Sequence, residues 1–429
     1  MILSRILSMY ESEPDLLRLR RAATGNPTAS AVGNCLAQLT MLRFPKLTNP
    51  EMRPIRTAWV FQDGHRQAEE LKAMIERAYP GLGGLGEELF YFGVPVTEAQ
   101  EMALAAKIAD GSLWGTVRHR FVPPRVELGA EGGLARTRLA ERDPNDPSRP
   151  RRMGFIVDPG SSMFWCPLYI DHMLKHPDHG LVLVEFKAMS RFGFRRAMMG
   201  DLEWRIQMQM AMMLDATGLD HGLIFIQCKD TCHKLELAFL RGQEKTRVTL
   251  TKTNGQQETF LVPRPGLAVD LEGRPVDLQE NETWDVGEVW TPWDPALLEQ
   301  ARRRVLDVLL FEPAGDKAWM REFGPSFLCE TCSGTGTQVI RKNSTEPLKK
   351  PKPCVDCNAT GQLEEAVLPW ACSYCATVRH CYGPAKARLE IGTKPEWIIR
   401  RADYEASGLT FTPRGAEPIP STVGMENSQ

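Results

Sequence analysis

The chain has 429 residues, 42% of them hydrophobic and 25% charged, which is the composition of a globular protein with room for two or three domains. Its net charge of −2 excludes a uniformly basic surface, so any contact with nucleic acid has to come from local basic patches. No apolar run approaches the ~18 residues that a membrane span needs, and the first residues, MILSRILSMYESEPD, lack the apolar stretch of a secretory signal. Eleven cysteines, several in C-x-x-C pairs, therefore favour metal binding in a reducing, cytoplasmic compartment over disulfides, and we expect no membrane partner.

Sequence patterns divide the chain into segments of different character. A helical pattern runs from about Gln62 to Arg77, whereas RDPNDPSRPRR is dense in charged and turn residues. In the central part, strand-like runs flank a methionine-rich helix, and Asn254-Gly255 marks a later hairpin. The expected segments are an N-terminal helix (1–27), a helical N-terminal part of the main domain (28–115), a flexible insertion (116–153), an α/β core with following hairpins (154–312), a zinc ribbon (313–366), a second cysteine-rich segment (367–390) and a C-terminal tail (391–429).

The stretch GLVLVEFKAM, residues 180–189, predicts a buried strand that ends in charged residues. Side chains alternate along a strand, so Glu185 and Lys187 point to the same face. A carboxylate can hold a divalent cation there, and the ammonium can stabilise a developing negative charge. The alternative is a surface ion pair at a strand end.

A second strand-like run, CPLYIDHML, precedes this strand, and the turn-rich KHPDHG between them predicts a β-hairpin. If the hairpin is centred near Asp178, Asp171 lies opposite Glu185 on the same face. Two adjacent carboxylates repel each other unless a cation lies between them, so these residues and Lys187 predict a Mg²⁺ or Mn²⁺ site with a catalytic lysine. Asp158, in GFIVDPG, is the alternative first carboxylate.

Basic and aromatic residues follow the strand in SRFGFRRAMMG. Arg191, Arg195 and Arg196 are candidates for contacts to a DNA backbone, and Phe192 or Phe194 for stacking on a base. The alternative is a solvated basic loop with two phenylalanines in the core.

Cysteines near the C-terminus form two groups. The pairs Cys329-x2-Cys332 and Cys354-x2-Cys357, separated by 21 residues, have the spacing of a four-cysteine zinc ribbon. Each pair is followed by turn residues, CSGTG and CNATG, whose backbone amides are expected to reach the thiolates. These units resemble DnaJ-type zinc fingers, although Ala359 replaces the first glycine of the second unit.

The second group, Cys372-x2-Cys375-x5-Cys381, is one ligand short of a four-thiolate site. His380 is a candidate fourth ligand for a zinc ion. The alternative is Cys35, far away in the sequence, in which case four thiolates suit an iron–sulfur cluster.

Together these motifs resemble the PD-(D/E)xK nucleases of the RecB-type branch, which includes the AddB and CRISPR-adaptation nucleases. Gly64-His65 resembles the branch's helical G-H element, and Gln207 its glutamine motif, although Ala211 stands where a tyrosine is usual. The three C-terminal cysteines with Cys35 resemble the branch's [4Fe–4S] clasp. The resemblance covers roughly residues 28–75, 155–240 and 370–385.

The resemblance implies a mixed central sheet flanked by helices, with a small zinc ribbon added. It implies that His65, Asp171 and Glu185 hold Mg²⁺ or Mn²⁺, that Lys187 and Gln207 assist catalysis, and that the clasp cysteines hold [4Fe–4S]. The expected activity is that of a metal-dependent DNA nuclease, an exonuclease on single-stranded ends, acting in recombination, repair, or phage or mobile-element replication. The sequence has no G-x-x-x-x-G-K-[ST] loop, so a separate helicase or recombination protein is the expected partner. The alternative is a DNA-binding or assembly module whose nuclease centre is inactive and whose metal sites are structural.

Overall fold

The computed structural model resolves the chain into two compact units, each described here by itself. The sheet unit contains Thr28–Gly33 and Trp59–Leu306, and the cysteine unit contains Asn34–Ala58 and Asp307–Pro418. Within these units the structure describes residues 27–48, 55–78, 88–128, 134–136, 142–143, 146–150, 154–176, 178–229, 247–251, 257–264, 267–269, 286–313, 319, 321–322, 324–338, 341–343, 346–347, 352–369, 372, 375–388 and 396–409. The expected N-terminal helix therefore lies almost wholly outside the described residues.

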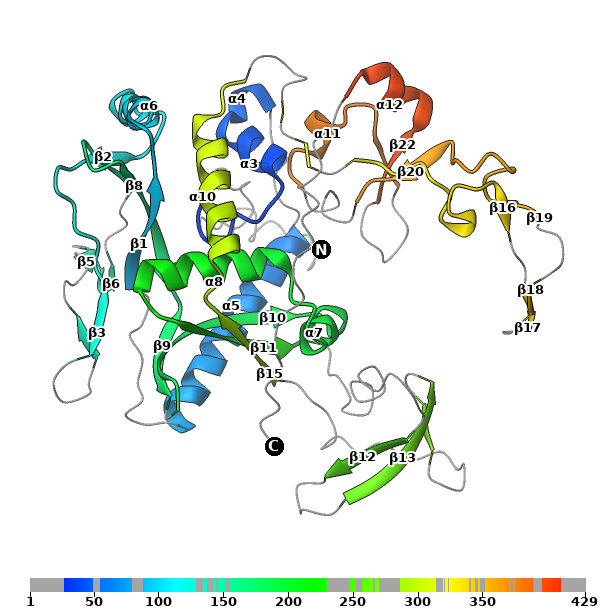
Figure 1. The fold of residues 1–429 in the computed structure, drawn as a ribbon, viewed down its shortest axis with the longest axis horizontal. Helices are drawn as coiled ribbons and strands as arrows, with labels where there is room; N and C mark the ends of the chain where they lie inside the picture. The colour runs from blue at the N-terminus through cyan, green and yellow to red at the C-terminus, as the bar shows by residue number, and fades with distance from the viewer. Residues whose placement is uncertain are drawn as a thin grey trace, which may run out of the picture. The chain divides into compact units, whose positions relative to one another are not determined.

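A four-stranded mixed sheet carries the predicted charged strand. Its order is β15-β11-β10-β9, with β9 at His172–His176, β10 at Gly180–Met189, β11 at His221–Cys228 and β15 at Val286–Pro292 (Figure 1). Strands β10 and β11 are parallel and are joined through α7 (Arg191–Met198) and α8 (Trp204–Thr217), as the strand–helix–strand pattern predicts. The other two pairings are antiparallel.

Helices cover both faces of this sheet. On one face, Leu71 of α5 (Ile55–Ala78) packs with Val184 and Phe186 of β10. On the other face, α8 approaches so closely that a Cβ at Gly222 of β11 would clash with the Met210 sulfur. Glu185 and Lys187 alternate with Val184 and Phe186 along β10, so they lie on the face covered by α8.

A second four-stranded sheet precedes the first along the chain. Its order is β1-β8-β7-β2, with β1 at Glu88–Pro95, β2 at Gly115–Val117, β7 at Phe155–Asp158 and β8 at Met163–Ile170, and α6 (Glu98–Ala109) follows β1. Asp171 lies between β8 and β9, at the point where the chain leaves one sheet and enters the other. The expectation of a helical part over 28–115 missed β1, whose apolar run ELFYFGVP is buried as a strand.

The remaining strands of the sheet unit are short. The segment 116–153, expected as a flexible insertion, holds two antiparallel pairs among its described residues: β3 (Val126–Leu128) with β4 (Leu134–Arg136), and β5 (Arg142–Asp143) with β6 (Asp146–Pro150). Further along, β12 (Arg247–Thr251) pairs with β13 (Gln257–Arg264), which also pairs with β14 (Leu267–Val269). Thr251 lies opposite Gln257, so this hairpin is centred on the predicted Asn254 turn.

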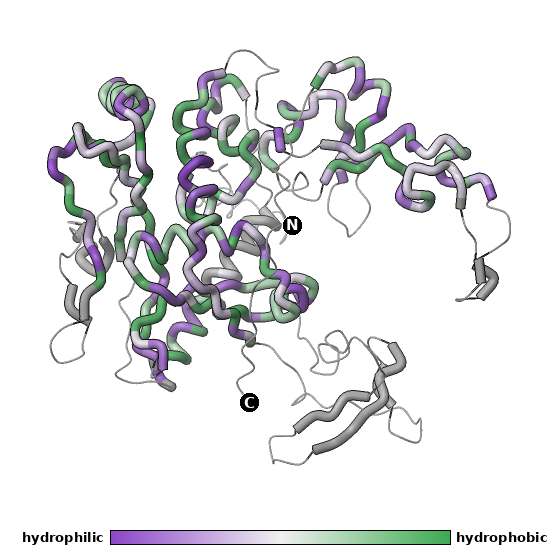
Figure 2. The backbone as a smooth tube through the Cα atoms, in the orientation of Figure 1, coloured by the Kyte–Doolittle hydropathy of each residue, from purple (hydrophilic) through white to green (hydrophobic). Residues whose placement is uncertain are grey.

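The cysteine unit combines short helices with small sheets. Its helices are α3 (Leu36–Arg43), α4 (Pro45–Thr48), η2 (Glu330–Cys332), α11 (Val378–Cys381) and α12 (Arg401–Ser407), and α10 (Pro295–Leu310) runs into it from the sheet unit. Its strands are β16 (Thr337–Gln338), β17 (Arg341–Asn343), β18 (Glu346–Pro347), β19 (Lys352–Pro353), β20 (Glu365–Val367), β21 (Lys386–Arg388) and β22 (Glu396–Arg400). Figure 2 shows hydrophilic and hydrophobic residues alternating along α7, as its sequence RFGFRRAM requires.

The expected C-terminal tail is part of this folded unit as far as residue 409. Strand β22 is the central strand of a three-stranded sheet, β20-β22-β21. Trp397 and Ile399 alternate along β22 and are buried against Cys372 and Cys381. The alternating EWIIR pattern buries one face of this strand.

Candidate active site and cysteine centres

The hairpin of β9 and β10 has the predicted register. His172 pairs with Val184 and His176 with Gly180, so the next position along places Asp171 opposite Glu185. The Asp171 carboxylate accepts a hydrogen bond of 3.3 Å from the backbone N–H of Phe186. Asp171, at the point where the chain passes from one sheet to the other, thus lies beside Glu185.

Lys187 joins this cluster through two hydrogen bonds. Its Nζ donates to Oε1 of Glu185 and, over 3.1 Å, to Oε1 of Gln209 in α8. The Gln209 amide nitrogen donates to the same Glu185 oxygen over 2.7 Å. Glu185 is 4% exposed and Gln209 7% exposed, so these two members of the network are buried, whereas Lys187 is half-buried.

The two carboxylates affect each other electrostatically. Burial, followed by the negative charge of Glu185, raises the pKa of Asp171 to about 8, although Lys187 opposes that shift. At neutral pH Asp171 therefore holds a proton unless a cation replaces it. Two adjacent carboxylates at a buried strand end are donors that fit a hard divalent cation such as Mg²⁺ or Mn²⁺.

The structure places Gln209, and not the expected Gln207, beside Lys187. Residues two apart on a helix face different directions, and Gln207 instead donates to the backbone carbonyl of Leu202 over 2.6 Å. Gln209 is a lone polar residue within the buried run from Met208 to Leu214. A buried amide inside an apolar helix face was the signal that sequence reasoning missed.

The alternative carboxylate, Asp158, has a different role. Its two oxygens accept hydrogen bonds from the backbone N–H groups of Arg120 at 2.7 Å and Phe121 at 3.0 Å. Arg120 has a φ of 55°, a left-handed conformation in which few non-glycine residues are stable. Asp158 therefore holds a loop at the end of β7, in the other sheet, and its oxygens are already engaged there.

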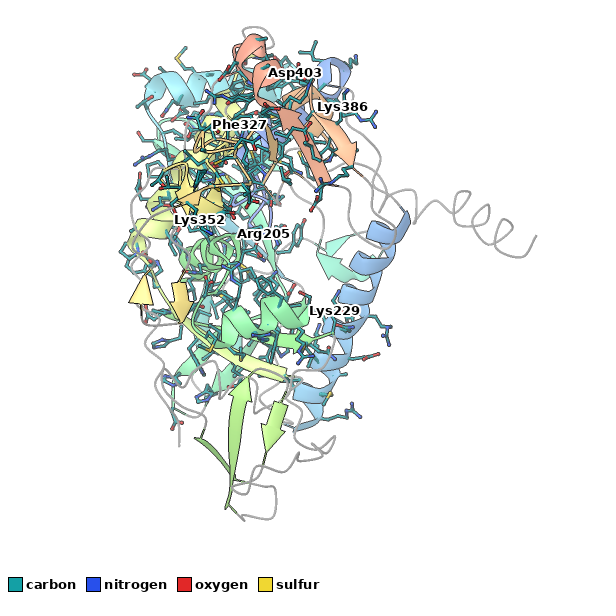
Figure 3. All side chains as sticks on the ribbon, turned by 90° about the vertical axis from the view of Figure 1, so that its right-hand side faces the viewer. Arg205, Lys229, Phe327, Lys352, Lys386 and Asp403 are labelled. Carbon is teal, nitrogen blue, oxygen red and sulfur yellow. The ribbon has the colours of Figure 1, made fainter. Side chains whose placement is uncertain are left out.

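His65 lies in α5, but its side chain is outside the described residues. Its neighbour Gly64 lies close to Lys229, since a Cβ on Gly64 would be 3.9 Å from the lysine Nζ (Figure 3). Lys229 follows β11, and its backbone N–H donates to the carbonyl of Met189 at the end of β10 over 2.8 Å. The edge where the parallel strands end thus carries a second lysine that no local sequence motif indicated.

Helix α7 begins at this same edge. Ser190 caps it by accepting a hydrogen bond from the Gly193 N–H. Arg191 and Arg196 are exposed and Arg195 is half-buried. The candidate DNA-binding arginines therefore lie on the helix that directly follows the strand bearing Lys187.

In the cysteine unit, Cys329, Cys332, Cys354 and Cys357 form what we call the compact cysteine group. All four are buried, and their sulfurs lie within 4.8 Å of one another. The sulfur of Cys329 is 3.6 Å from that of Cys354, and that of Cys332 is 3.7 Å from that of Cys357. A tetrahedral ion with Zn–S bonds of about 2.3 Å requires sulfurs about 3.8 Å apart, so this buried group can bind a metal ion.

Backbone N–H groups stabilise the thiolate form of the compact cysteine group. Gly336 donates to the sulfur of Cys332 and Gly361 to that of Cys357, each over 3.3 Å, as the turn residues predicted. Burial opposes ionisation, but the Gly336 amide and the neighbouring thiols lower the pKa of Cys332 to about 7. The folded chain therefore favours a thiolate before any metal binds.

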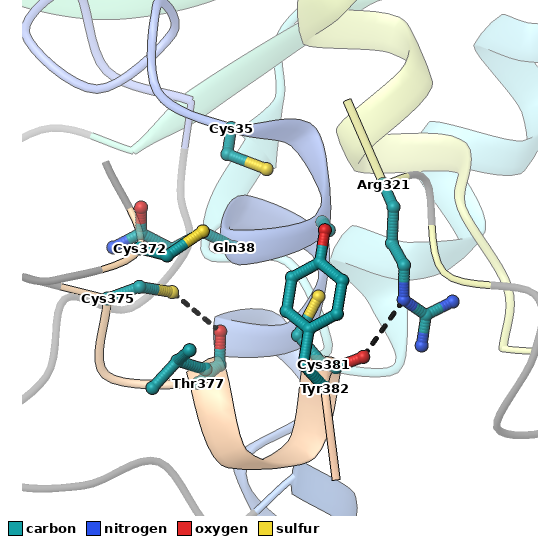
Figure 4. A pocket seen from close by; sticks show the side chains of 10 residues that line it. Cys35, Gln38, Arg321, Cys372, Cys375, Thr377, Cys381 and Tyr382 are labelled. Atoms are coloured by element: carbon teal, nitrogen blue, oxygen red, sulfur yellow. Dashed lines mark hydrogen bonds between the residues drawn. The ribbon is translucent and has the colours of Figure 1, made fainter. Parts of the chain in front are cut away.

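A wide cysteine group, Cys35, Cys372, Cys375 and Cys381, surrounds a pocket elsewhere in the same unit (Figure 4). Cys35 is the N-cap of α3 and comes together with the three C-terminal cysteines across more than three hundred residues of sequence. His380 does not line this pocket; its ring packs edge-on against Trp319, with 5.6 Å between the ring centroids. The structure thus brings Cys35, rather than the alternative ligand His380, to the three cysteines.

Two consecutive residues connect the sides of this pocket. Buried Arg321 donates from Nε to the carbonyl of Cys381 over 3.0 Å. Glu322 accepts a hydrogen bond of 2.6 Å from the backbone N–H of Leu36, next to Cys35. Neither residue belongs to a motif, so sequence reasoning did not find them.

The wide cysteine group differs from the compact one in spacing and in acidity. Among the described residues, only the compact group has its ligand atoms all within 4.8 Å, so the sulfurs of the wide group are further apart. Burial, and then the neighbouring thiols, raise the pKa of Cys372. Burial likewise raises the pKa of Cys381 to about 12, although Arg321 opposes the shift. Such a donor set fits a polynuclear cluster, in which each thiolate binds its own iron, better than a single ion.

Comparisons with known proteins add little to this geometry. No protein-family model matches the chain, and no curated protein matches it. The chain is similar to one solved structure, the crystal structure of SSO0001, with 8% sequence identity and a TM-score of 0.28, over 73% of this chain and 87% of that chain. A likeness this weak carries no argument. Within the described residues, no helix is both long and apolar enough to cross a membrane.

Proposed function

We propose that this chain is a metal-dependent phosphodiesterase of the PD-(D/E)xK type that cleaves DNA, as an exonuclease on single-stranded ends. The observation that carries the proposal is the cluster of buried Glu185 with half-buried Asp171 and Lys187 at the break between two sheets. Burial and the neighbouring Glu185 carboxylate raise the pKa of Asp171, so this carboxylate ionises readily only when a cation binds beside it. Ionisable groups with strongly perturbed pKa values cluster at functional sites.

In this proposal Asp171 and Glu185 hold Mg²⁺ or Mn²⁺, with His65 as a further candidate ligand. A cation held there would supply Lewis-acid chemistry, which polarises a phosphoryl group and lowers the pKa of an attacking water. Lys187 donates a hydrogen bond to the phosphoryl oxygen on which negative charge develops. Gln209 is a positioning residue: it holds the Lys187 ammonium and the Glu185 carboxylate in one fixed arrangement. Arg191, Arg195 and Arg196 contact the DNA backbone, and a separate helicase or recombination protein supplies unwound ends.

The two cysteine groups take structural cofactors in this proposal. The compact group holds zinc, because its sulfur spacing is that of one tetrahedral ion. The wide group holds [4Fe–4S], because its four thiols, two buried and two half-buried, surround a pocket at a larger spacing.

Cleavage of end-labelled single-stranded DNA tests the proposed activity, with Mg²⁺, Mn²⁺ or EDTA present. We expect metal-dependent cleavage by the parent and a loss of about 10²–10³-fold in kcat for Lys187→Ala, because the ammonium acts on the transition state. If the parent binds DNA but does not cleave it with either metal, the chain is instead a DNA-binding or assembly module.

The two glutamines of α8 provide a matched pair for the positioning role. Gln209→Ala should lower kcat about 10–100-fold and raise the Mn²⁺ concentration needed for half-maximal activity, since it releases Glu185 and Lys187. Gln207→Ala, two residues away, should leave both quantities near the parent values. Equal effects of the two substitutions would contradict the role of Gln209.

A further inference from the structure

Two phenylalanines of α7 have opposite environments. Phe194 is fully buried, and its ring would be 3.2 Å from a Cβ on Gly287 of β15. Phe192, two residues earlier, is 70% exposed. The sequence left open whether these phenylalanines lie in the core or stack on a base. Residues two apart on a helix face different sides, so one ring is buried and the other is exposed.

The exposed ring has a fixed cationic neighbour. Arg196 lies one turn further along α7, with its guanidinium carbon 5.9 Å from the centroid of the Phe192 ring. Arg196 is itself held by an ion pair of 2.6 Å with Asp201. The Arg196 guanidinium, which Asp201 orients, therefore lies against one side of the Phe192 ring. Most of the Phe192 side chain is open to solvent.

The position of this ring relates it to the proposed active site. Helix α7 starts two residues after the last residue of β10, so Phe192 lies just beyond the end of the strand that carries Lys187. Arg191 and Arg195 add positive charge on the same short helix. An aromatic ring among cations is the arrangement that binds single strands, since bases stack on the ring and cations contact phosphates.

We propose that Phe192 is a stacking platform for a base of single-stranded DNA on its way to Lys187, and that it selects single strands over duplex. This inference rests on the proposed function and assigns the residue that recognises its single-stranded substrate. In a duplex the faces of the bases are already covered by their neighbours, so only an unpaired strand offers a base to the ring.

Binding of two oligonucleotides with equal charge isolates stacking from phosphate contacts. The probes are a fluorescein-labelled dT 12-mer and a 12-mer of abasic sites, measured by anisotropy with Ca²⁺ in place of Mg²⁺. We expect the parent to bind the dT strand about 5–100-fold more tightly than the abasic strand. Phe192→Ala should remove that preference by weakening dT binding alone, and Phe192→Trp should retain it.

Met199→Ala is the matched control, because Met199 is another exposed apolar residue at the end of α7 but has no aromatic face. It should bind both probes as the parent does. Three outcomes would overturn the proposal. One is a dT preference that is unchanged in Phe192→Ala, and another is a parent without any dT preference. The third is a loss of affinity for a blunt DNA duplex in Phe192→Ala that equals its loss for the dT strand. Cleavage of single strands by the parent would still support the nuclease in each case, so the two failures are distinguishable.

Discussion

The compact and the wide cysteine groups lie in one unit, yet the chain brings four thiols together in each by a different route. The compact group consists of two similar turns whose cysteines are 25 positions apart, and amides of both turns point at its sulfurs. In the wide group, one sulfur comes from the start of α3 and three come from residues 372–381. The first group is organised by local backbone geometry, and the second by the tertiary fold.

This difference predicts how each group depends on its metal. The compact group already favours a thiolate, because its amides lower the pKa of Cys332. The thiols of the wide group stay protonated without a cofactor, because burial raises the pKa of Cys35 and of Cys372. Cofactor binding at the wide group has to displace these protons, which opposes it. We still expect this group to contribute more to stability through its cofactor, because that cofactor closes a very long loop of the chain.

The largest expected effect is that of Cys35→Ala. The variant should lose iron, acid-labile sulfide and the broad absorbance near ~400 nm while keeping its zinc. Its free energy of unfolding should fall by about 4 kcal/mol, by analogy with other cross-links that close long loops. Cys332→Ser should do the reverse, losing zinc and keeping iron, and Cys166→Ala, at a buried cysteine outside both groups, should keep both metals.

Two outcomes would contradict this assignment. A colourless parent with two zinc ions per chain would exclude the iron–sulfur cluster. A Cys35→Ala variant with its full iron content would mean that another residue supplies the fourth ligand.

An intermediate effect concerns the pH dependence of alkylation in metal-free protein. The Cys332 thiol, whose pKa is about 7, should become reactive toward iodoacetamide as the pH rises from 6 to 8, because the thiolate is the reacting form. Cys381, whose pKa is about 12, should remain unmodified over that range. Peptide mass spectrometry after short pulses gives both rates, and equal reactivity of the two cysteines would remove the proposed contrast.

The smallest expected effect lies within the compact group and compares its two turns. Ala359 has a φ of 64°, whereas the equivalent position of the first turn is Gly334, with a φ of 80°. Alanine is strained in this left-handed region, so Ala359→Gly should stabilise the zinc-loaded protein by about 0.5–1 kcal/mol. Gly334→Ala should destabilise it by a similar amount. Thermal unfolding of both variants provides the check, and shifts of the same sign would contradict the equivalence of the turns.

Some site residues were predictable because their relations are local. The alternation of a strand and the turn residues between two strands placed Asp171 opposite Glu185. Other residues were not predictable, because packing decides them. Gln209 rather than Gln207 reaches Lys187 because of the rotation of α8 against the sheet, and Asp158 binds backbone amides of a loop far from it in sequence.

The sequence by itself determined the hairpin register, the pairing of Glu185 with Lys187 on one face, and the C-x-x-C turns. These relations follow from the two-residue alternation of a strand and from the three-residue spacing of the C-x-x-C turns, both of which local backbone geometry imposes. Only the tertiary structure decided that Cys35 meets the C-terminal cysteines, that Lys229 lies beside α5, and that Phe192 is exposed while Phe194 is buried. Those relations depend on which surfaces pack together, and no local pattern specifies that.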